Sequence, residues 1–201
     1  AATMEGVFQV GNTNKIEQKV LRELCFVLSP SRRYPGRVWC GTGRGLKTLI
    51  NKNNRWIEGD GVKEIEQTIR YIAEDKKGNL WLVTYTGGVI KVNFPFDIDR
   101  PVVTRYDTPQ RLPEGQVYTA QAAGHVIFGT EKGLFRFDEK NNAFIPDLTL
   151  GPGFAGGPGS KPVFLITEDK NKNIWFHSQS RNYQAIPGPG DSFTIYSNPF
   201  L

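Results

Sequence analysis

Few residues in this sequence could carry out acid–base catalysis. There are only two histidines, His125 and His177. A histidine beside an acid is a common general base, but the internal repeat described below places His125 in a hairpin turn and His177 within a strand. We therefore expect no paired-histidine catalytic site. The sequence also lacks a G-x-S-x-G nucleophile elbow, an H-E-x-x-H motif and a GK[ST] phosphate loop, so it gives no positive indication of catalysis.

The acidic residues that invite a calcium site lie in turns rich in lysine. Asp75, Asp138 and Asp169 begin the stretches DKKGN, DEKNN and DKNKN. Calcium takes about six to eight oxygen ligands, and lysines among the ligands oppose such a site. We expect these aspartates to cap their own turns instead. Cys25 and Cys40 are too few and too far apart for zinc, and their redox state stays open. No cofactor or metal is expected.

Basic residues cluster in one part of the chain. The net charge is +5, and no acid occurs between Arg32 and Glu58. The cluster is either a solvated surface or an anion-binding face. Nucleic acid is not an expected partner, because no recognition motif accompanies the charge. The basic residues of this cluster are Arg32, Arg33, Arg37, Arg44, Lys47, Lys52 and Arg55.

Composition indicates a globular chain of short strands. Of the 201 residues, 38% are hydrophobic and 22% charged, and 22 glycines and 13 prolines accompany a single methionine. This composition favours an all-β fold over a helix bundle. No apolar run is long enough for a membrane span, so we expect no membrane contact by this segment.

An internal repeat organises the chain. The segment Ile69–Val92 returns in weaker form at 26–49, 117–137 and 163–176. One aromatic residue marks each copy, about 42 to 47 residues apart, with Phe128 standing in for tryptophan in the third copy. We expect these marker aromatics to pack between neighbouring units, with carbohydrate stacking as the alternative for one tryptophan. The markers are Trp39, Trp81, Phe128 and Trp175.

Each copy has the pattern of four short strands. In the second copy we predict strands at Ile69–Glu74, Leu80–Thr84, Val89–Asn93 and Val102–Tyr106, with a hairpin turn at 75–79. A helix over Lys63–Ala73 is the less favoured interpretation of that stretch. Gly45, Gly88 and Gly133 precede the third strand, where a tight entry needs a residue without Cβ. The fourth copy has Lys172 at the Gly78 position and lacks the second glycine, so its hairpins should be the least regular.

Four antiparallel strands every 40 to 50 residues are typical of β-propeller blades. We predict an all-β chain of about four and a half blades, as part of a larger propeller. Residues 1–24 form a half blade of third and fourth strands in which Gly6 plays the part of Gly45, and blades follow at 25–68, 69–116, 117–162 and 163–201. Open edge strands could pair with a second copy, so a homodimer is possible.

The second copy resembles the two-component regulator propeller repeat. The resemblance rests on Ile69, Ile72, Glu74, Asp75, Gly78, Asn79, Leu80, Trp81, Leu82, Thr84, Gly87 and Gly88. It implies a non-catalytic periplasmic sensor region of a hybrid histidine kinase that recognises an oligosaccharide, with the rest of that kinase as partner. Two alternatives stay open. One is an enzyme similar to the streptogramin lyases, and the other is a propeller that binds only proteins.

Propeller architecture also indicates where a ligand would bind. The loops between the second and third strands and the connections between blades gather on one face. A guanidinium there can pair bidentately with a carboxylate or sulfate, so these loops would suit an acidic sugar. The alternative for each residue is a solvated loop position. The Gly/Pro-rich run 151–162 is long enough to reach over the same face. The candidate ligand-binding residues are Arg44, Tyr85, Arg111, Glu131, Lys132, Gln179 and Arg181.

Overall fold

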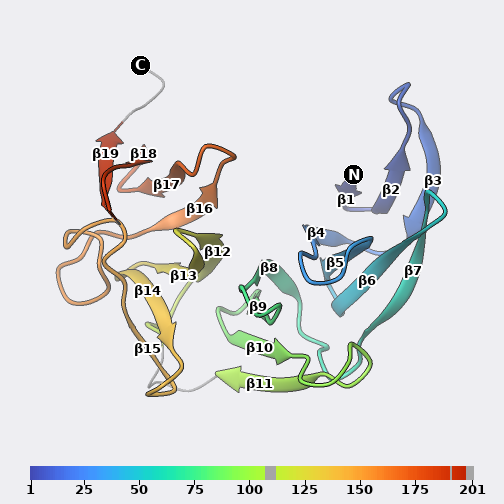
Figure 1. Cartoon of the computed structure of the whole chain (residues 1–201), viewed down its shortest axis with the longest axis horizontal. Coiled ribbons are helices and arrows are strands. Elements are labelled where there is room, and N and C mark those ends of the chain that lie inside the picture. Colours follow the sequence, from blue (N-terminus) through green and yellow to red (C-terminus); the bar gives the residue numbers. More distant parts are fainter. Residues whose placement is uncertain (107–111, 191, 198–201) are drawn as a thin grey trace. The chain divides into compact units, whose positions relative to one another are not determined.

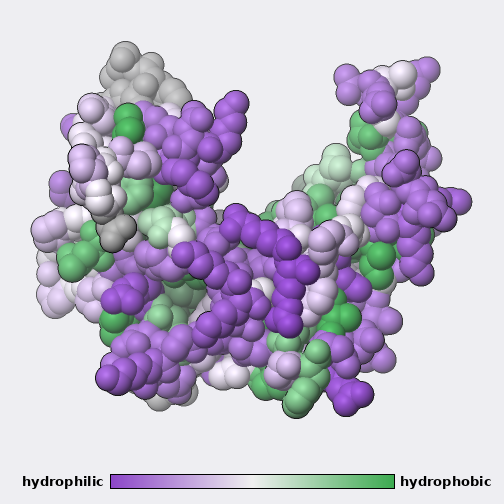
Figure 2. All heavy atoms as spheres, viewed as in Figure 1, coloured by the Kyte–Doolittle hydropathy of each residue, from purple (hydrophilic) through white to green (hydrophobic). Residues whose placement is uncertain are grey.

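The computed structural model describes residues 1–106, 112–190 and 192–197, and Arg111 lies outside these ranges. All regular elements in them are β-strands, arranged in five antiparallel sheets (Figure 1). Over the same residues no helix is long and apolar enough to span a membrane. The face seen in Figure 2 is mainly hydrophilic, and its hydrophobic residues form small separate groups. The expected all-β fold of four-stranded blades is confirmed.

The sheets follow one another along the chain, and each is a meander of consecutive strands. The N-terminal sheet has three strands, β1 (Ala2–Thr3), β2 (Gly6–Val10) and β3 (Ile16–Leu21). The first blade contains β4 (Cys25–Pro30), β5 (Arg37–Thr42), β6 (Gly45–Lys52) and β7 (Arg55–Val62). The second contains β8 (Ile69–Glu74), β9 (Leu80–Thr84), β10 (Val89–Asn93) and β11 (Val102–Tyr106), which are the four predicted strands. The third contains β12 (Tyr118–Ala122), β13 (His125–Thr130), β14 (Gly133–Asp138) and β15 (Ala143–Pro146). The fourth contains β16 (Phe164–Glu168), β17 (Ile174–Ser178), β18 (Arg181–Pro187) and β19 (Phe193–Ser197).

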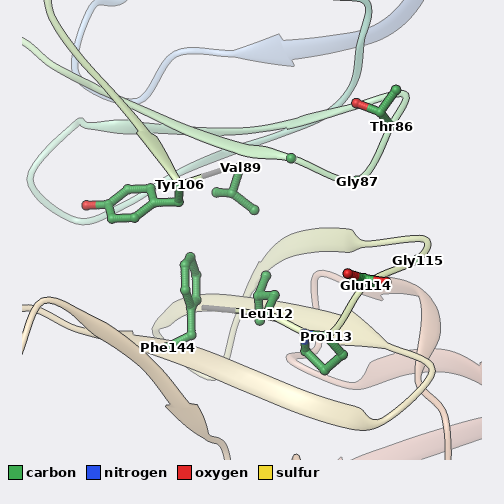
Figure 3. Close-up of a pocket in the computed structure, with 10 residues that line it drawn as sticks. Thr86, Gly87, Val89, Tyr106, Leu112, Pro113, Glu114, Gly115 and Phe144 are labelled. Atoms are coloured by element: carbon green, nitrogen blue, oxygen red, sulfur yellow. The ribbon is translucent and has the colours of Figure 1, made fainter. Parts of the chain in front are cut away.

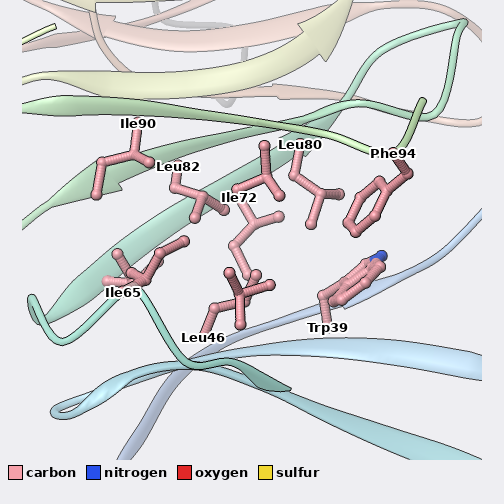
Figure 4. Packing of buried hydrophobic residues seen from close by; sticks show 11 residues of the cluster. Trp39, Leu46, Ile65, Ile72, Leu80, Leu82, Ile90 and Phe94 are labelled. Atoms are coloured by element: carbon pink, nitrogen blue, oxygen red, sulfur yellow. The ribbon is translucent and has the colours of Figure 1, made fainter. Parts of the chain in front are cut away.

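The chain forms two compact units. The first unit is Ala1–Tyr85 with Ile90–Arg105, and the second is Thr86–Val89 with Tyr106–Leu201. In the first unit, an apolar core lies between the first and second blades, with Trp39 and Leu46 on one side and Leu80 and Phe94 on the other (Figure 4). The Trp39 and Phe94 rings stack with centroids 5.4 Å apart. Trp39 therefore packs between blades, as predicted.

The core of the second unit lies between the third and fourth blades. Ile127 and Leu134 of the third blade meet Val163, Ile174 and Phe176 from the fourth. The first strands of the two blades, β12 and β16, are in contact. The same relation joins β4 to β8 in the first unit. Each blade thus packs one face of its sheet on its neighbour in the unit.

Strand register corrects the assignment of Phe128 as the third marker aromatic. The second strand of a blade ends opposite the first residue of the third strand, as Thr42 does with Gly45 and Thr130 with Gly133. Three residues before Thr42 is Trp39, whereas three before Thr130 is Ile127. Side chains alternate between faces along a strand, so Phe128 lies on the opposite face, with its ring 5.0 Å from that of Phe144. The aromatic residue type suggested the wrong register.

Tight entry into the third strand is confirmed at Gly45. Its φ is +106°, and a Cβ there would lie 1.9 Å from the Ile65 carbonyl oxygen. Gly6 and Gly133 also have positive φ, at the start of β2 and β14. In the second blade the neighbouring residue Gly87 has this conformation, with φ +86°, and a Cβ on it would lie 2.2 Å from the Gly115 carbonyl oxygen. The predicted role of Gly88 therefore falls on Gly87.

The N-terminal sheet has the predicted third and fourth strands as β2 and β3. The additional strand β1 pairs with β2, and Thr3 lies opposite Gly6 as Thr42 lies opposite Gly45. By this register, β1 corresponds to the end of the second strand of a blade, as the end of β5 does in the first blade. The sheet therefore contains slightly more of a blade than the sequence indicates.

The irregularity expected in the fourth blade lies in a different place. Lys172 takes φ +68°, close to the +79° of Gly78, so the first turn keeps its geometry without glycine. Gln179 and Ser180 both have positive φ, as in a two-residue type I′ hairpin, and β17 pairs with β18 without interruption. The pairing is broken instead between β16 and β17, where the register shifts between Phe164 and Thr167 and Leu165 has φ +49°.

A glutamate joins the two blades within each unit, buried in the case of Glu74 and partly buried in the case of Glu168. The Glu74 carboxylate, at the end of β8, accepts hydrogen bonds from the Ser31 hydroxyl and from the backbone N–H groups of Arg32 and Arg33 in the preceding blade. Glu168, at the end of β16, accepts the backbone N–H of Ala123 at 2.9 Å. The contacted residues lie in the turns after β4 and after β12, so each glutamate contacts the turn that follows the first strand of the neighbouring blade. We call these two contacts the glutamate clamps.

Candidate ligand-binding site

Two of the predicted ligand-binding residues lie in the first unit. Arg44 is exposed in the turn between β5 and β6, and its backbone N–H donates to the Thr42 hydroxyl at 3.1 Å. Tyr85 follows β9 and is 69% exposed. The Arg70 guanidinium lies over the Tyr85 ring, 5.6 Å from its centroid. Both side chains are accessible, as a binding residue must be.

Four further predicted residues lie in the second unit. Glu131 and Lys132 form the turn between β13 and β14, whereas Gln179 lies in the turn between β17 and β18 and Arg181 is the first residue of β18. All four are exposed. The predicted set is thus divided between two units, and Arg111 falls outside the described residues.

The basic cluster of the first blade is divided among local contacts. Arg33 donates to the Lys77 carbonyl, and Arg37 donates to the Thr48 hydroxyl and lies over the Trp39 ring. Lys47 lies 4.0 Å from Glu23 and 3.9 Å from Glu58. Arg55 donates to the Gln18 side chain. These contacts fit the interpretation as a solvated surface better than a single anion-binding face.

The second unit contains a cavity of about 230 Å³ that the sequence did not indicate. Figure 3 shows it between the turn that follows β9 and the segment 112–115. Its apolar wall includes Tyr106 and Phe144, whose ring centroids are 5.6 Å apart, and its polar groups include Thr86 and Glu114. The residues that line it are Thr86, Gly87, Gly88, Val89, Tyr106, Leu112, Pro113, Glu114, Gly115 and Phe144. They come from four separate stretches of the chain, so no local motif could reveal the cavity.

One predicted binding residue lies beside a residue that lines this cavity. A Cβ placed on Gly115 would lie 3.7 Å from the Glu131 carboxylate, so Glu131 adjoins the segment that carries Glu114. The polar groups that line the cavity are the Glu114 carboxylate, the Thr86 hydroxyl and glycine backbone, and the Glu131 carboxylate lies next to them. Such a set accepts hydrogen bonds from hydroxyl or ammonium groups, and it does not favour the acidic sugar expected from the arginines.

His125 is paired with Asp147, an acid that lies 22 residues further along the chain. His125 is the first residue of β13, directly after the predicted turn, and its Nε2 lies 2.6 Å from Asp147 Oδ2. Its Nδ1 lies 3.2 Å from the Ala123 carbonyl oxygen. The hydrogen bond to Asp147 raises the pKa of His125 against the opposing effect of burial. Asp147 directly follows β15, and only the folded sheet brings it to His125.

This pair does not have the geometry of a general base. A base needs a free nitrogen lone pair, and both ring nitrogens of His125 face an oxygen. Asp147 is itself buried, which opposes its charge, but bonds from His125 and from the Thr149 backbone N–H leave its pKa lowered. The second histidine, His177, faces its cross-strand neighbour Asn182, at 3.1 Å between Nδ1 and Oδ1. The geometry therefore gives no support to catalysis by His125.

The three turn aspartates are caps, as predicted. Asp75 accepts backbone N–H bonds from Lys77 and Asn79, and Asp169 accepts the corresponding bonds from Asn171 and Asn173. Asp138 accepts from Lys140 and from the Asn141 side chain. In the part of the chain that the structure describes, no three acidic, histidine or cysteine side chains gather as metal ligands would.

Comparison with known proteins identifies the repeat. The family model of the two component regulator propeller matches residues 63–86. The second blade carries a regulator propeller repeat. The predicted resemblance is therefore confirmed, and the matched residues include all of those that suggested it except Gly87 and Gly88. None of the curated proteins matches the chain.

Solved structures with similar folds include extracellular domains of two component systems. One is the extracellular domain of the putative hybrid two component system BT3049 from B. thetaiotaomicron, with 19% identity and a TM-score of 0.66 over 98% of this chain. Another is that of BT4673 from the same organism, with 17% identity and a TM-score of 0.65 over 98%. The chain spans 27% and 25% of these two structures. The propeller domain of Myceliophteria thermophila Cps50 (Swd1) is similar over 92% of this chain and 62% of its own length, with 13% identity and a TM-score of 0.56. These likenesses show the propeller fold.

Proposed function

We propose that this chain is a ligand-binding propeller segment of an extracytoplasmic two-component sensor, with no catalytic activity of its own. The observation that carries this proposal is the regulator propeller match at residues 63–86. Extracellular domains of hybrid two-component systems among the similar structures support the same setting. The parent protein would be a histidine kinase, and the rest of that kinase would be the partner of this segment.

The ligand we propose is a neutral oligosaccharide, bound at the cavity of the second unit. Aromatic walls such as Tyr106 and Phe144 can pack on the apolar face of a sugar ring. The Glu114 and Glu131 carboxylates can accept hydrogen bonds from sugar hydroxyls. A cavity of about 230 Å³ suits one sugar unit, with flanking units reaching the exposed turns. On this proposal the exposed turns of the second unit supply Glu131, Lys132, Gln179 and Arg181.

Binding of neutral and acidic oligosaccharides to the immobilised chain tests this proposal. We expect saturable binding of a neutral oligosaccharide, weakened about tenfold or more by Glu114→Gln, because a carboxylate accepts hydrogen bonds more strongly than an amide. Glu5→Gln is the matched control, since Glu5 is exposed and lies in the first unit. Absence of binding to any neutral sugar, or equal loss in both variants, would contradict the proposed ligand.

The same experiment separates the other two functions. An enzyme would consume its ligand with time, which mass spectrometry of the bound sugar detects. A propeller that binds only proteins would retain a kinase or a second copy in a pull-down and would bind no sugar. The engaged ring nitrogens of His125 give the lyase alternative no support.

A further inference from the structure

Cys25 and Cys40 lie in the first unit, outside the proposed ligand site, and neither has a role in ligand binding. Cys25 begins β4 and Cys40 lies in β5, the neighbouring antiparallel strand. Their side chains are 5% and 0% exposed and are reduced in this structure. Both belong to the apolar cluster that joins the N-terminal sheet to the first blade, with Val7, Leu21 and Leu49.

A β-bulge places the two thiols on the same face of the sheet. Cys40 lies opposite Leu28, and Cys25 is three residues before Leu28, so in a regular strand Cys25 would point to the other face. The register shifts between Cys25 and Val27, which puts Cys25 opposite Thr42. Thr42 is two residues from Cys40 and shares its face. The extra residue, Phe26, therefore turns Cys25 toward Cys40.

The two thiols lie in the same cluster, on the same face of the sheet. Their interaction is the largest influence on the pKa of both groups. It lowers the pKa of Cys25, whose thiol also lies 3.3 Å from the Val27 carbonyl oxygen. The same interaction, together with burial, raises the pKa of Cys40. Cys25 is thus the better nucleophile of the pair, and Cys40 is the resolving thiol that would react second.

We propose that Cys25 and Cys40 form a redox-active pair that closes to an intramolecular disulfide under oxidising conditions. The oxidant is a small-molecule disulfide or a thiol–disulfide oxidoreductase. The Cys25 thiolate attacks one sulfur of the oxidant, which forms a mixed disulfide and releases one thiol. The Cys40 thiolate then attacks the Cys25 sulfur and releases the second thiol. Two protein S–H groups become one S–S bond as the oxidant disulfide is reduced to two thiols.

Closure of this bond would brace one particular hairpin. The disulfide would tie β4 to β5 at the end remote from the turn 31–36, and Glu74 already holds that turn through Arg32 and Arg33. The covalent link and the glutamate clamp would then fix opposite ends of the same hairpin. Because both sulfurs are buried, the exchange needs an opening of the contact between β4 and the N-terminal sheet. Oxidation should therefore be slow in the folded chain and rapid during folding.

The experiment compares the chain refolded in oxidised and in reduced glutathione. After denaturation and alkylation, we expect mass spectrometry to show no alkylated cysteine in the oxidised sample, with a mass lower by two hydrogens, and two alkylated cysteines in the reduced sample. The oxidised chain should run as a monomer and unfold several degrees higher. Two alkylated cysteines under every redox condition, or only intermolecular disulfides, would overturn the proposal.

Variants separate the disulfide from general effects of oxidation. Cys40→Ala should lose the dependence of the unfolding temperature on redox conditions and should form a mixed disulfide with glutathione at Cys25. The double variant Cys25→Ala with Cys40→Ala should show neither effect. If a variant fails to fold, the alkylation result on the unaltered chain still decides the question. Sugar binding lies in the other unit and should not follow the redox state, so the two proposals fail independently.

Discussion

The carboxylate of Glu74 accepts the backbone N–H of Arg33 at 2.9 Å, across the junction between the second and first blades. The same carboxylate accepts the Arg32 N–H at 3.0 Å and the Ser31 hydroxyl at 3.2 Å, while Glu74 is only 5% exposed. Ser31 Oγ in turn accepts the Tyr34 N–H at 3.1 Å. One buried glutamate thus accepts three hydrogen bonds from a neighbouring turn.

Replacement of Glu74 by glutamine should destabilise the first unit. The amide keeps one acceptor oxygen but places an NH₂ group against backbone donors, which leaves buried N–H groups unsatisfied at a cost of about 1–3 kcal/mol. Urea unfolding measures the change. Glu66→Gln is the control, because Glu66 is exposed, and it should change the free energy of unfolding by less than about 0.5 kcal/mol. Equal free energies of unfolding for the two variants would show that the Glu74 clamp does not stabilise the first unit.

Two glycines in one turn should respond differently to alanine. At Gly45, φ is +106° and a Cβ would lie 1.9 Å from the Ile65 carbonyl oxygen, whereas a Cβ at Gly43 meets no atom within 4 Å. Gly45→Ala should cost at least about 2 kcal/mol, and Gly43→Ala should stay within about 0.5 kcal/mol. Thermal and urea unfolding of the two variants check this. Comparable losses would mean that the turn, rather than the close approach, sets the cost.

The contribution of the His125–Asp147 pair to stability should depend on pH. The pKa of His125 is raised above its ordinary 6.5 in the folded chain, so its stabilising effect is complete below about pH 6.5 and is lost as the pH rises through the folded value. The pKa of Asp147 is lowered below 3.8, so its effect is lost only as the pH falls through that lower value. Arg136 Nε, 3.9 Å from Asp147, is the other charge at the pair.

Urea unfolding at a series of pH values tests this behaviour. The unaltered chain should lose stability, relative to His125→Asn, as the pH rises from mildly acidic to alkaline. NMR titration of the His125 ring should give a pKa above its ordinary value of 6.5. If the free energy of unfolding changes with pH in the same way in the unaltered chain and in His125→Asn, the pair makes no pH-dependent contribution to stability.

Two tryptophans at the same repeat position should contribute unequally to the stability of the fold. Trp39 is 1% exposed and lies between two blades, whereas Trp175 at the same repeat position is half-buried and donates its Nε1–H to Asp169 at 2.9 Å. Trp39→Ala should cost about 3–5 kcal/mol, and Trp175→Ala about half of that or less. Trp175→Ala should also raise the pKa of Asp169, because the indole bond is the largest influence that lowers it. A cost for Trp175→Ala equal to that of Trp39→Ala would contradict this difference in packing.

The strands of the second blade could be predicted to the residue because local signals agree there. Hydrophobic alternation, the Asp75 cap and Gly78 all indicate the same hairpin. In the third blade these signals conflict, since Ile127 and Phe128 are adjacent and both apolar. Only the pairing of Thr130 with Gly133 decides which of them takes the tryptophan position.

The candidate site was less predictable than the fold. Exposed turn residues such as Glu131 follow from the repeat, but the cavity combines Tyr106 and Phe144 on different strands with Glu114 on a connection. The roles of Glu74 and Asp147 likewise depend on partners in other strands. Side-chain chemistry across strands becomes visible only once register and packing are known.

The first and third blades have no glutamate at the position of Glu74 and Glu168, and this difference bears on how the chain unfolds. By register with Glu74 and Glu168, the first blade has Pro30 and the third has Gln121 at this position. Carboxylate clamps therefore link the first blade with the second and the third with the fourth, inside each unit. We therefore expect the smallest cooperative block to be a pair of blades, and amide hydrogen exchange should protect the members of a pair together.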